Sequence, residues 1–95
     1  MDFVRGLIVK SAAGHDKGGF FVVLEAAGGF AVICDGRRRS LGHPKRKSVK
    51  HLFPTGRALP DDLMKTDRGI RRALSEFQRG NAFPHEEANV CQNKT

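Results

Sequence analysis

The chain of 95 residues contains no tryptophan and no tyrosine, and most of its seven phenylalanines lie in short apolar runs where burial is expected. The exposed aromatic platforms on which proteins stack unpaired bases are therefore not evident. The chain also lacks a run of about 18 apolar residues, which a membrane-spanning helix would need. Its first ten residues lack the basic start, apolar middle and small-residue cleavage site of a secretory signal. We therefore expect a cytoplasmic protein that does not bind a membrane.

Cysteine is also scarce, and metal-ligand spacing is missing. The two cysteines, Cys34 and Cys91, do not make a disulfide framework, and neither belongs to a C-x-x-C pair. The four histidines are scattered, so no zinc-ligand spacing is present. Cys34 lies in the apolar run A-V-I-C-D, which favours a buried apolar filler over a nucleophile. No metal, no cofactor and no enzymatic activity are expected.

Acidic residues are absent from one stretch, residues 37–50, which reads R-R-R-S-L-G-H-P-K-R-K-S-V-K. Seven of the 17 Lys and Arg residues lie there, which leaves ten cations against ten acids in the rest of the chain. The whole net charge of +7 is thus concentrated in this basic stretch. Clustered cations without acids create a field that a polyanion can use and that folding does not require. The basic stretch predicts nucleic-acid binding, and a solvated face without a partner is the weaker alternative.

Short apolar runs separated by turn residues predict a mainly β domain. Gly28-Gly29 and Asp35-Gly36 are hairpin signals, and Gly42-His43-Pro44 breaks the basic stretch. The repeated spacing of strands and turns favours a small antiparallel barrel or sandwich. The expected strands are residues 4–11, 20–25, 30–35, 37–41 and 48–53.

A C-terminal helix is expected to cover this sheet. The central apolar runs are hydrophobic on both alternating faces, so something must pack on the second face. Ile70, Leu74 and Phe77 recur at helical spacing, with a cap at Thr66 or Asp67 and a stop at Gly80. We expect this helix to pack on the barrel as a lid.

The expected organisation has three parts. These are a barrel over residues 1–55, a C-terminal helical segment over residues 56–80 and a flexible tail over residues 81–95. Residues 53–56 are the expected connector, and residues 60–64 are expected to form a short helical turn.

The strand–loop–strand G-L-I-V-K-S-A-A-G-H-D-K-G-G-F-F-V-V-L resembles a KOW motif, with Gly14 and a charged Lys17-Gly18 turn between two hydrophobic strands. The D-G-x-x-R and P-K-x-K-x-x-K-H-L patterns that follow strengthen the likeness. Residues 4–53 thus resemble bacterial KOW-domain RNA-binding proteins, which are similar to a group of archaeal and eukaryotic large-subunit ribosomal proteins. The resemblance implies an SH3-like barrel of the KOW type that binds RNA, usually ribosomal RNA or the ribosome.

The candidate RNA contacts come from the basic stretch and from the KOW-like loop. Alternation along a strand would place Arg37 and Arg39 on one face and Arg38 on the other, so only a subset would face RNA. Lys45, Arg46, Lys47 and Lys50 are the favoured members of that subset. The full set of candidates is Lys17, Arg37, Arg38, Arg39, His43, Lys45, Arg46, Lys47, Lys50 and His51.

The expected helix carries a second basic surface, for which solubility and packing are favoured over RNA contact. Its members are Arg68, Arg71, Arg72 and Arg79.

The leading expectation is a non-catalytic RNA-binding protein that is monomeric when free. Two alternatives stay open, a protein-interaction module of the transcription and translation machinery and a non-specific nucleic-acid binder. The charge argues for a polyanion, and only the resemblance selects RNA.

Overall fold

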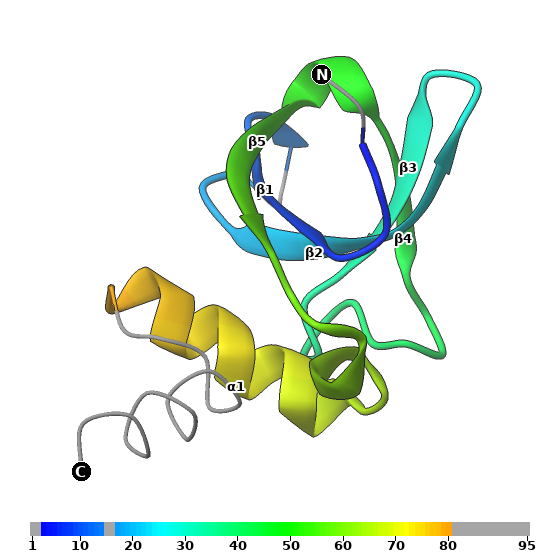
Figure 1. The fold of residues 1–95 in the computed structure, drawn as a ribbon. Coiled ribbons are helices and arrows are strands. Elements are labelled where there is room, and N and C mark those ends of the chain that lie inside the picture. Colours follow the sequence, from blue (N-terminus) through cyan, green and yellow to red (C-terminus); the bar gives the residue numbers. More distant parts are fainter. Residues whose placement is uncertain (1–2, 15–16, 81–95) are drawn as a thin grey trace, which may run out of the picture.

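The computed structural model describes residues 3–14 and 17–80. Five strands form one antiparallel sheet in the order β4-β3-β2-β1-β5, which curls into a barrel-like shape with helix α1 against one side (Figure 1). The fold of the described residues is therefore mainly β with a C-terminal helix, as the sequence predicts. The elements are β1 (Leu7–Ser11), β2 (Phe20–Ala27), β3 (Phe30–Cys34), β4 (Lys45–Ser48), the 3-10 helix η2 (Val49–His51), β5 (Leu52–Ala58), the 3-10 helix η3 (Asp61–Met64) and α1 (Asp67–Gln78).

The turn between β2 and β3 is the tight hairpin that the two glycines predict. Ala27 pairs with Phe30, and the residues between them have φ values of +60° at Gly28 and +83° at Gly29. A two-residue hairpin whose strands keep their natural twist needs positive φ at both central positions, which glycine adopts without strain. This part of the sequence prediction is confirmed.

The first half of strand β2, residues 20–24, is buried on both faces because the barrel interior lies on one side and α1 on the other. Phe21 and Val23 pack inside the barrel, whereas Val22 packs with Ile70 of α1. Burying a side chain of this size stabilises the fold by about 1.5–3 kcal/mol. The prediction that a C-terminal helix covers the second face is confirmed.

Helix α1 begins and ends where the sequence predicts. The Thr66 hydroxyl accepts a hydrogen bond from the Gly69 N–H at 3.0 Å, which caps the first turn. Gly80 has a φ of +81°, the left-handed conformation that often follows a helix. The Phe77 ring meets the Phe20 ring of β2 edge to face, with 5.4 Å between centroids. The short helical turn before α1 is also present, as η3.

The prediction of a fourth strand at residues 37–41 is wrong, because this segment forms a turn. The Asp35 carboxylate accepts hydrogen bonds from the N–H groups of Arg37 at 2.8 Å and Arg39 at 3.0 Å. The Asp35 N–H in turn donates to the Arg39 carbonyl at 2.9 Å. An aspartate that binds its own following backbone favours a turn over a strand. The argument that strand alternation sorts the three arginines therefore does not hold.

The last two strands also differ from the prediction. Residues 48–53 are not one strand, since Ser48 ends β4, η2 follows, and Leu52 begins β5. Residues 53–56 are not a connector but lie inside β5, which continues past residue 55 to Ala58. Pro54 is tolerated there because β5 lies at the end of the sheet order, where a missing N–H costs no ladder hydrogen bond.

The structure does not test the expected flexible tail. The tail at 81–95 lies outside the described residues. Within residues 3–14 and 17–80, no helix has the length and apolar character needed to cross a membrane.

Candidate nucleic-acid interface

The basic stretch is divided among a loop, strand β4 and η2. Figure 1 shows the loop at residues 35–44 beside α1 and η2 at the far end of the barrel. The cations that are adjacent in sequence are thus spread along the barrel instead of forming one compact patch. The exposed candidates are Lys17, Arg37, Arg38, His43, Arg46, Lys50 and His51, whereas Arg39 and Lys45 are half-buried.

Lys47 does not belong to the exposed surface. It pairs with the fully buried Ala31, so its side chain lies on the interior face of the sheet. Its Nζ donates hydrogen bonds to Ser11 Oγ at 2.8 Å and to the Ala13 carbonyl at 2.6 Å, and the residue is 8% exposed. We therefore remove Lys47 from the candidate contacts, although the sequence places it among the favoured ones.

Arg46, one position earlier on β4, lies on the opposite, outward face. Its guanidinium carbon is 4.4 Å from the centroid of the Phe30 ring, and Phe30 is 41% exposed. Phe53 of β5 is 60% exposed. The expectation that phenylalanines are buried is therefore wrong for these two residues. A guanidinium stacked on an exposed ring makes a flat surface of the kind on which bases stack.

The loop that carries Arg37 and Arg38 is fixed against the start of α1. Gly36 has a φ of +78° and packs so closely that a Cβ atom there would collide with the Asp67 carbonyl and lie 3.0 Å from the Arg71 nitrogen. Arg71 Nη1 donates to the Gly36 carbonyl at 3.2 Å, and the Leu41 N–H donates to Asp67 Oδ1 at 2.7 Å. The two exposed arginines are therefore presented by an anchored loop.

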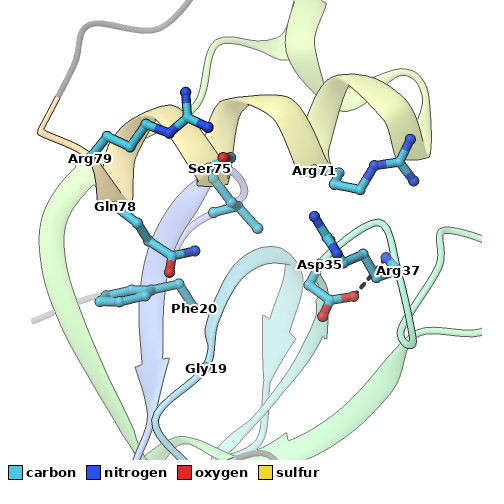
Figure 2. Close-up of a pocket in the computed structure, with 9 residues that line it drawn as sticks. Gly19, Phe20, Asp35, Arg37, Arg71, Ser75, Gln78 and Arg79 are labelled. Carbon is cyan, nitrogen blue, oxygen red and sulfur yellow. Dashed lines mark hydrogen bonds between the residues drawn. The ribbon is translucent and has the colours of Figure 1, made fainter.

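A groove of about 450 Å³ lies between α1 and this end of the sheet (Figure 2). It brings Arg37 of the basic stretch together with Arg71 and Arg79 of the helix. An adjoining, more open hollow shares Arg37 and Arg71 and adds Arg38. The groove is lined by Gly19, Phe20, Asp35, Arg37, Arg71, Leu74, Ser75, Gln78 and Arg79.

The sequence interpretation favoured packing and solubility for the helix arginines and thus missed this arrangement. A signal was present: Arg71, Ser75 and Gln78 recur at i, i+4 and i+7, directly beside the buried stripe of Ile70, Leu74 and Phe77. A polar face that flanks a buried one lies at the edge of the helix contact, where grooves form.

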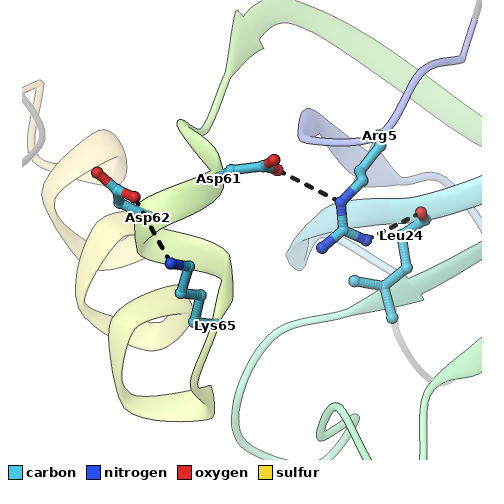
Figure 3. A network of polar contacts seen from close by, with 5 residues as sticks. All are labelled: Arg5, Leu24, Asp61, Asp62 and Lys65. Carbon is cyan, nitrogen blue, oxygen red and sulfur yellow. Dashed lines mark hydrogen bonds and ion pairs between the residues drawn. The ribbon is translucent and has the colours of Figure 1, made fainter.

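Other exposed cations are matched by acids near η3 (Figure 3). Arg5 Nε lies 3.4 Å from Asp61 Oδ1, and Arg5 Nη1 donates to the Leu24 carbonyl at 3.4 Å. Lys65 Nζ lies 4.0 Å from Asp62 Oδ1. Exposed pairs of this kind contribute about 0–1 kcal/mol to stability. In each of these two pairs the acid offsets the charge of the cation.

The Cys34 thiol is buried and stays protonated at neutral pH. Burial, with smaller contributions from the Asp67 and Asp35 carboxylates, raises the pKa of this thiol to about 12. Cys34 is fully buried, as expected for an apolar filler. Across residues 3–14 and 17–80, no group of three His, Cys, Asp or Glu side chains could hold a metal ion.

No protein-family model matches the chain, and no curated protein is similar to it.

Proposed function

We propose that the protein is a non-catalytic RNA-binding protein of the cytoplasm, built on an SH3-like barrel of the KOW type, with ribosomal RNA or the ribosome as its partner. One observation carries the proposal. The acid-free stretch at residues 37–50 supplies exposed cations from an anchored loop, from β4 and from η2. The KOW-like strand–loop–strand selects RNA among the polyanions.

The exposed cations would act by neutralising phosphates and releasing the counterions condensed on them. Arginine grips a phosphate through two N–H groups or stacks on a base, whereas lysine acts as a mobile point charge. The exposed Lys and Arg candidates are five, namely Lys17, Arg37, Arg38, Arg46 and Lys50. If all five engage a single strand, the logarithm of the binding constant falls with the logarithm of salt concentration at a slope of about −3.5.

Sedimentation of the protein with ribosomes, together with titration of labelled ribosomal RNA at several salt concentrations, tests the proposal. The expected result is co-sedimentation and a salt slope that becomes shallower by about 0.7–0.9 in Arg38→Gln. Lys65→Gln is the matched control, because it removes one exposed cation that already has Asp62 beside it. Free protein in every fraction, together with no salt-sensitive binding, would overturn the proposal.

One alternative is a protein-interaction module of the transcription and translation machinery. The exposed Phe53 on strand β5 favours it, because an exposed aromatic side chain at a sheet edge can anchor a partner. Reversing the charge at Arg37 and Arg38 to Glu would then spare partner binding. A non-specific nucleic-acid binder is recognised by equal competition from duplex DNA at moderate salt.

A further inference from the structure

We propose that the groove between α1 and the loop at residues 35–38 holds one unpaired nucleotide of the bound RNA, with its phosphate at Arg37 and Arg71 and its base against Phe20. This inference rests on the proposed function and deepens it. It assigns to the helix a binding role that neither the basic stretch nor the KOW-like hairpin supplies.

The charge balance of the groove favours a phosphate. Arg37 and Arg71 line both the groove and the adjoining hollow. The nearby acid, Asp35, already accepts two backbone N–H groups through Oδ1. At the rim, Arg79 Nη1 lies 3.5 Å from Glu76 Oε2, so its charge is partly offset. Arg71 uses Nη1 to hold the Gly36 carbonyl, and a guanidinium with five N–H donors retains others for a phosphate oxygen.

The far end of the groove offers an aromatic ring. Figure 2 shows Phe20 and Gln78 together there, while the Arg37 side chain reaches from the opposite end toward Ser75. The Phe20 ring is held by its edge-to-face contact with Phe77 and by Lys10, whose Nζ lies 5.7 Å from the ring centroid, and its remaining surface lines the groove. Arginine for the phosphate and an aromatic ring for the base is the usual combination for unpaired nucleotides.

The dimensions and the polar groups also fit a nucleotide unit. A volume of about 450 Å³ falls within the range of small-ligand sites. Ser75 and Gln78 place a hydroxyl and a carboxamide along the helix side, where a sugar hydroxyl or a base edge can bind.

The adjoining hollow favours a nucleotide within a chain over a free nucleotide. It continues from the same two arginines, Arg37 and Arg71, and adds Arg38. A second phosphate can therefore lie next to the first. A single-stranded RNA occupies both spaces, whereas a mononucleotide fills one.

Calorimetric titration of the whole protein with three probes tests this assignment: a single-stranded RNA hexanucleotide, adenosine 5′-monophosphate and a blunt RNA duplex. The hexanucleotide is expected to bind at least about tenfold more tightly than the mononucleotide. Gln78→Glu, which places a negative charge in the groove, is expected to weaken hexanucleotide binding about fivefold or more. Arg72→Gln is the matched control, because it makes the same change in charge on the same helix at an exposed residue that does not line the groove.

Phe20→Leu is the second variant, since it keeps an apolar side chain and removes the ring. It is expected to weaken hexanucleotide binding about fivefold, with little effect on the duplex. Thermal unfolding of each variant separates a binding defect from a folding defect, and the exposed Gln78 has little packing to lose.

The failures are distinguishable. Equal loss in Gln78→Glu and Arg72→Gln, with wild-type RNA binding intact, overturns the groove and leaves the RNA-binding function standing. Mononucleotide binding as tight as hexanucleotide binding overturns the assignment to a nucleotide within a chain. If the wild-type protein binds ribosomal RNA but not the hexanucleotide, the groove assignment fails and the proposed function stands. If it binds no ribosomal RNA either, the proposed function itself fails.

Discussion

The ammonium group of Lys47 donates a hydrogen bond to Ser11 Oγ at 2.8 Å and thereby joins β4 to β1. Two other strands, β3 and β2, separate these elements in the sheet, so the contact spans the barrel interior. A second hydrogen bond, to the Ala13 carbonyl, ties the same lysine to the loop that follows β1. Lys47, one of the cations of the basic stretch, thus stabilises the fold and is not available at the surface.

Replacing Lys47 by Met is expected to lower the free energy of unfolding by about 1.5–3 kcal/mol, because hydrogen bonds from a charged donor are lost and the Ser11 hydroxyl stays buried without this donor. Urea unfolding monitored by circular dichroism measures the change. Lys50→Met is the control, since Lys50 is exposed and its loss is expected to leave stability within about 0.5 kcal/mol. A Lys47→Met protein as stable as the wild type would contradict the structural role.

Gly36→Ala is expected to destabilise the protein by about 1–3 kcal/mol, because alanine is strained at a φ of +78° and its Cβ would collide with the Asp67 carbonyl. The midpoint of thermal unfolding reports the loss. Gly42→Ala, in the same loop, is a matched comparison, because the nearest atom to its added Cβ is Ser40 Oγ at 4.0 Å. Equal midpoints in the two variants would show that the loop does not depend on this close approach.

If the proposed RNA binding holds, Arg46→Lys is expected to weaken single-stranded RNA binding about fivefold while leaving the salt slope unchanged, because lysine keeps the charge and loses the planar guanidinium that lies over the Phe30 ring. Fluorescence anisotropy at several salt concentrations separates the two effects. Lys50→Arg is the companion variant and is expected to bind at least as tightly as the wild type. A shallower slope in Arg46→Lys would mean that the residue contributes something other than stacking.

The buried Cys34 thiol is expected to make the free energy of unfolding fall as pH rises from about 9 to about 12. The unfolded thiol ionises near pH 9.0, whereas burial raises the pKa in the folded protein to about 12. Across this window the folded protein retains the proton and the unfolded chain releases it, so unfolding becomes more favourable with increasing pH. The contribution is therefore complete below pH 9 and is lost as the pH approaches 12.

Urea unfolding at several pH values measures this slope, and Cys34→Ala is expected to make it shallower. Thiol labelling in a Cys91→Ser background gives an independent check, because only Cys34 is then counted. Rapid labelling of the native protein at pH 8 would contradict the burial of this thiol.

The sequence predicts those parts of the fold that depend on local patterns. The glycine pair at the hairpin and the spacing of Ile70, Leu74 and Phe77 each determine an element almost alone. The prediction for residues 37–41 fails because three arginines and a leucine are compatible with a strand, whereas the Asp35 carboxylate binds the backbone N–H groups of Arg37 and Arg39 and favours a turn. That preference depends on a side chain outside the segment.

The candidate site is harder to predict because exposure depends on pairing. Adjacent residues of β4 have opposite roles, with Arg46 stacked on Phe30 at the surface and Lys47 bound inside. Which of the two faces outward is determined by the register with β3, and a shift of one residue would exchange them. The groove depends on contacts between segments that lie far apart in the chain, such as Arg71 with the Gly36 carbonyl, and local periodicity carries no information on these.

The docking of Gly36 on the start of α1 makes the spacing between Arg37 and Arg71 a property of tertiary structure. A denatured chain, or a fragment that ends before the helix, keeps every cation of the basic stretch and attracts polyanions through charge alone. Such a chain no longer holds the backbone of residues 36–37 against the start of α1, beside Arg71. If the proposed RNA binding holds, attraction through charge alone therefore survives denaturation, whereas any contact that uses both arginines in the groove requires the folded protein.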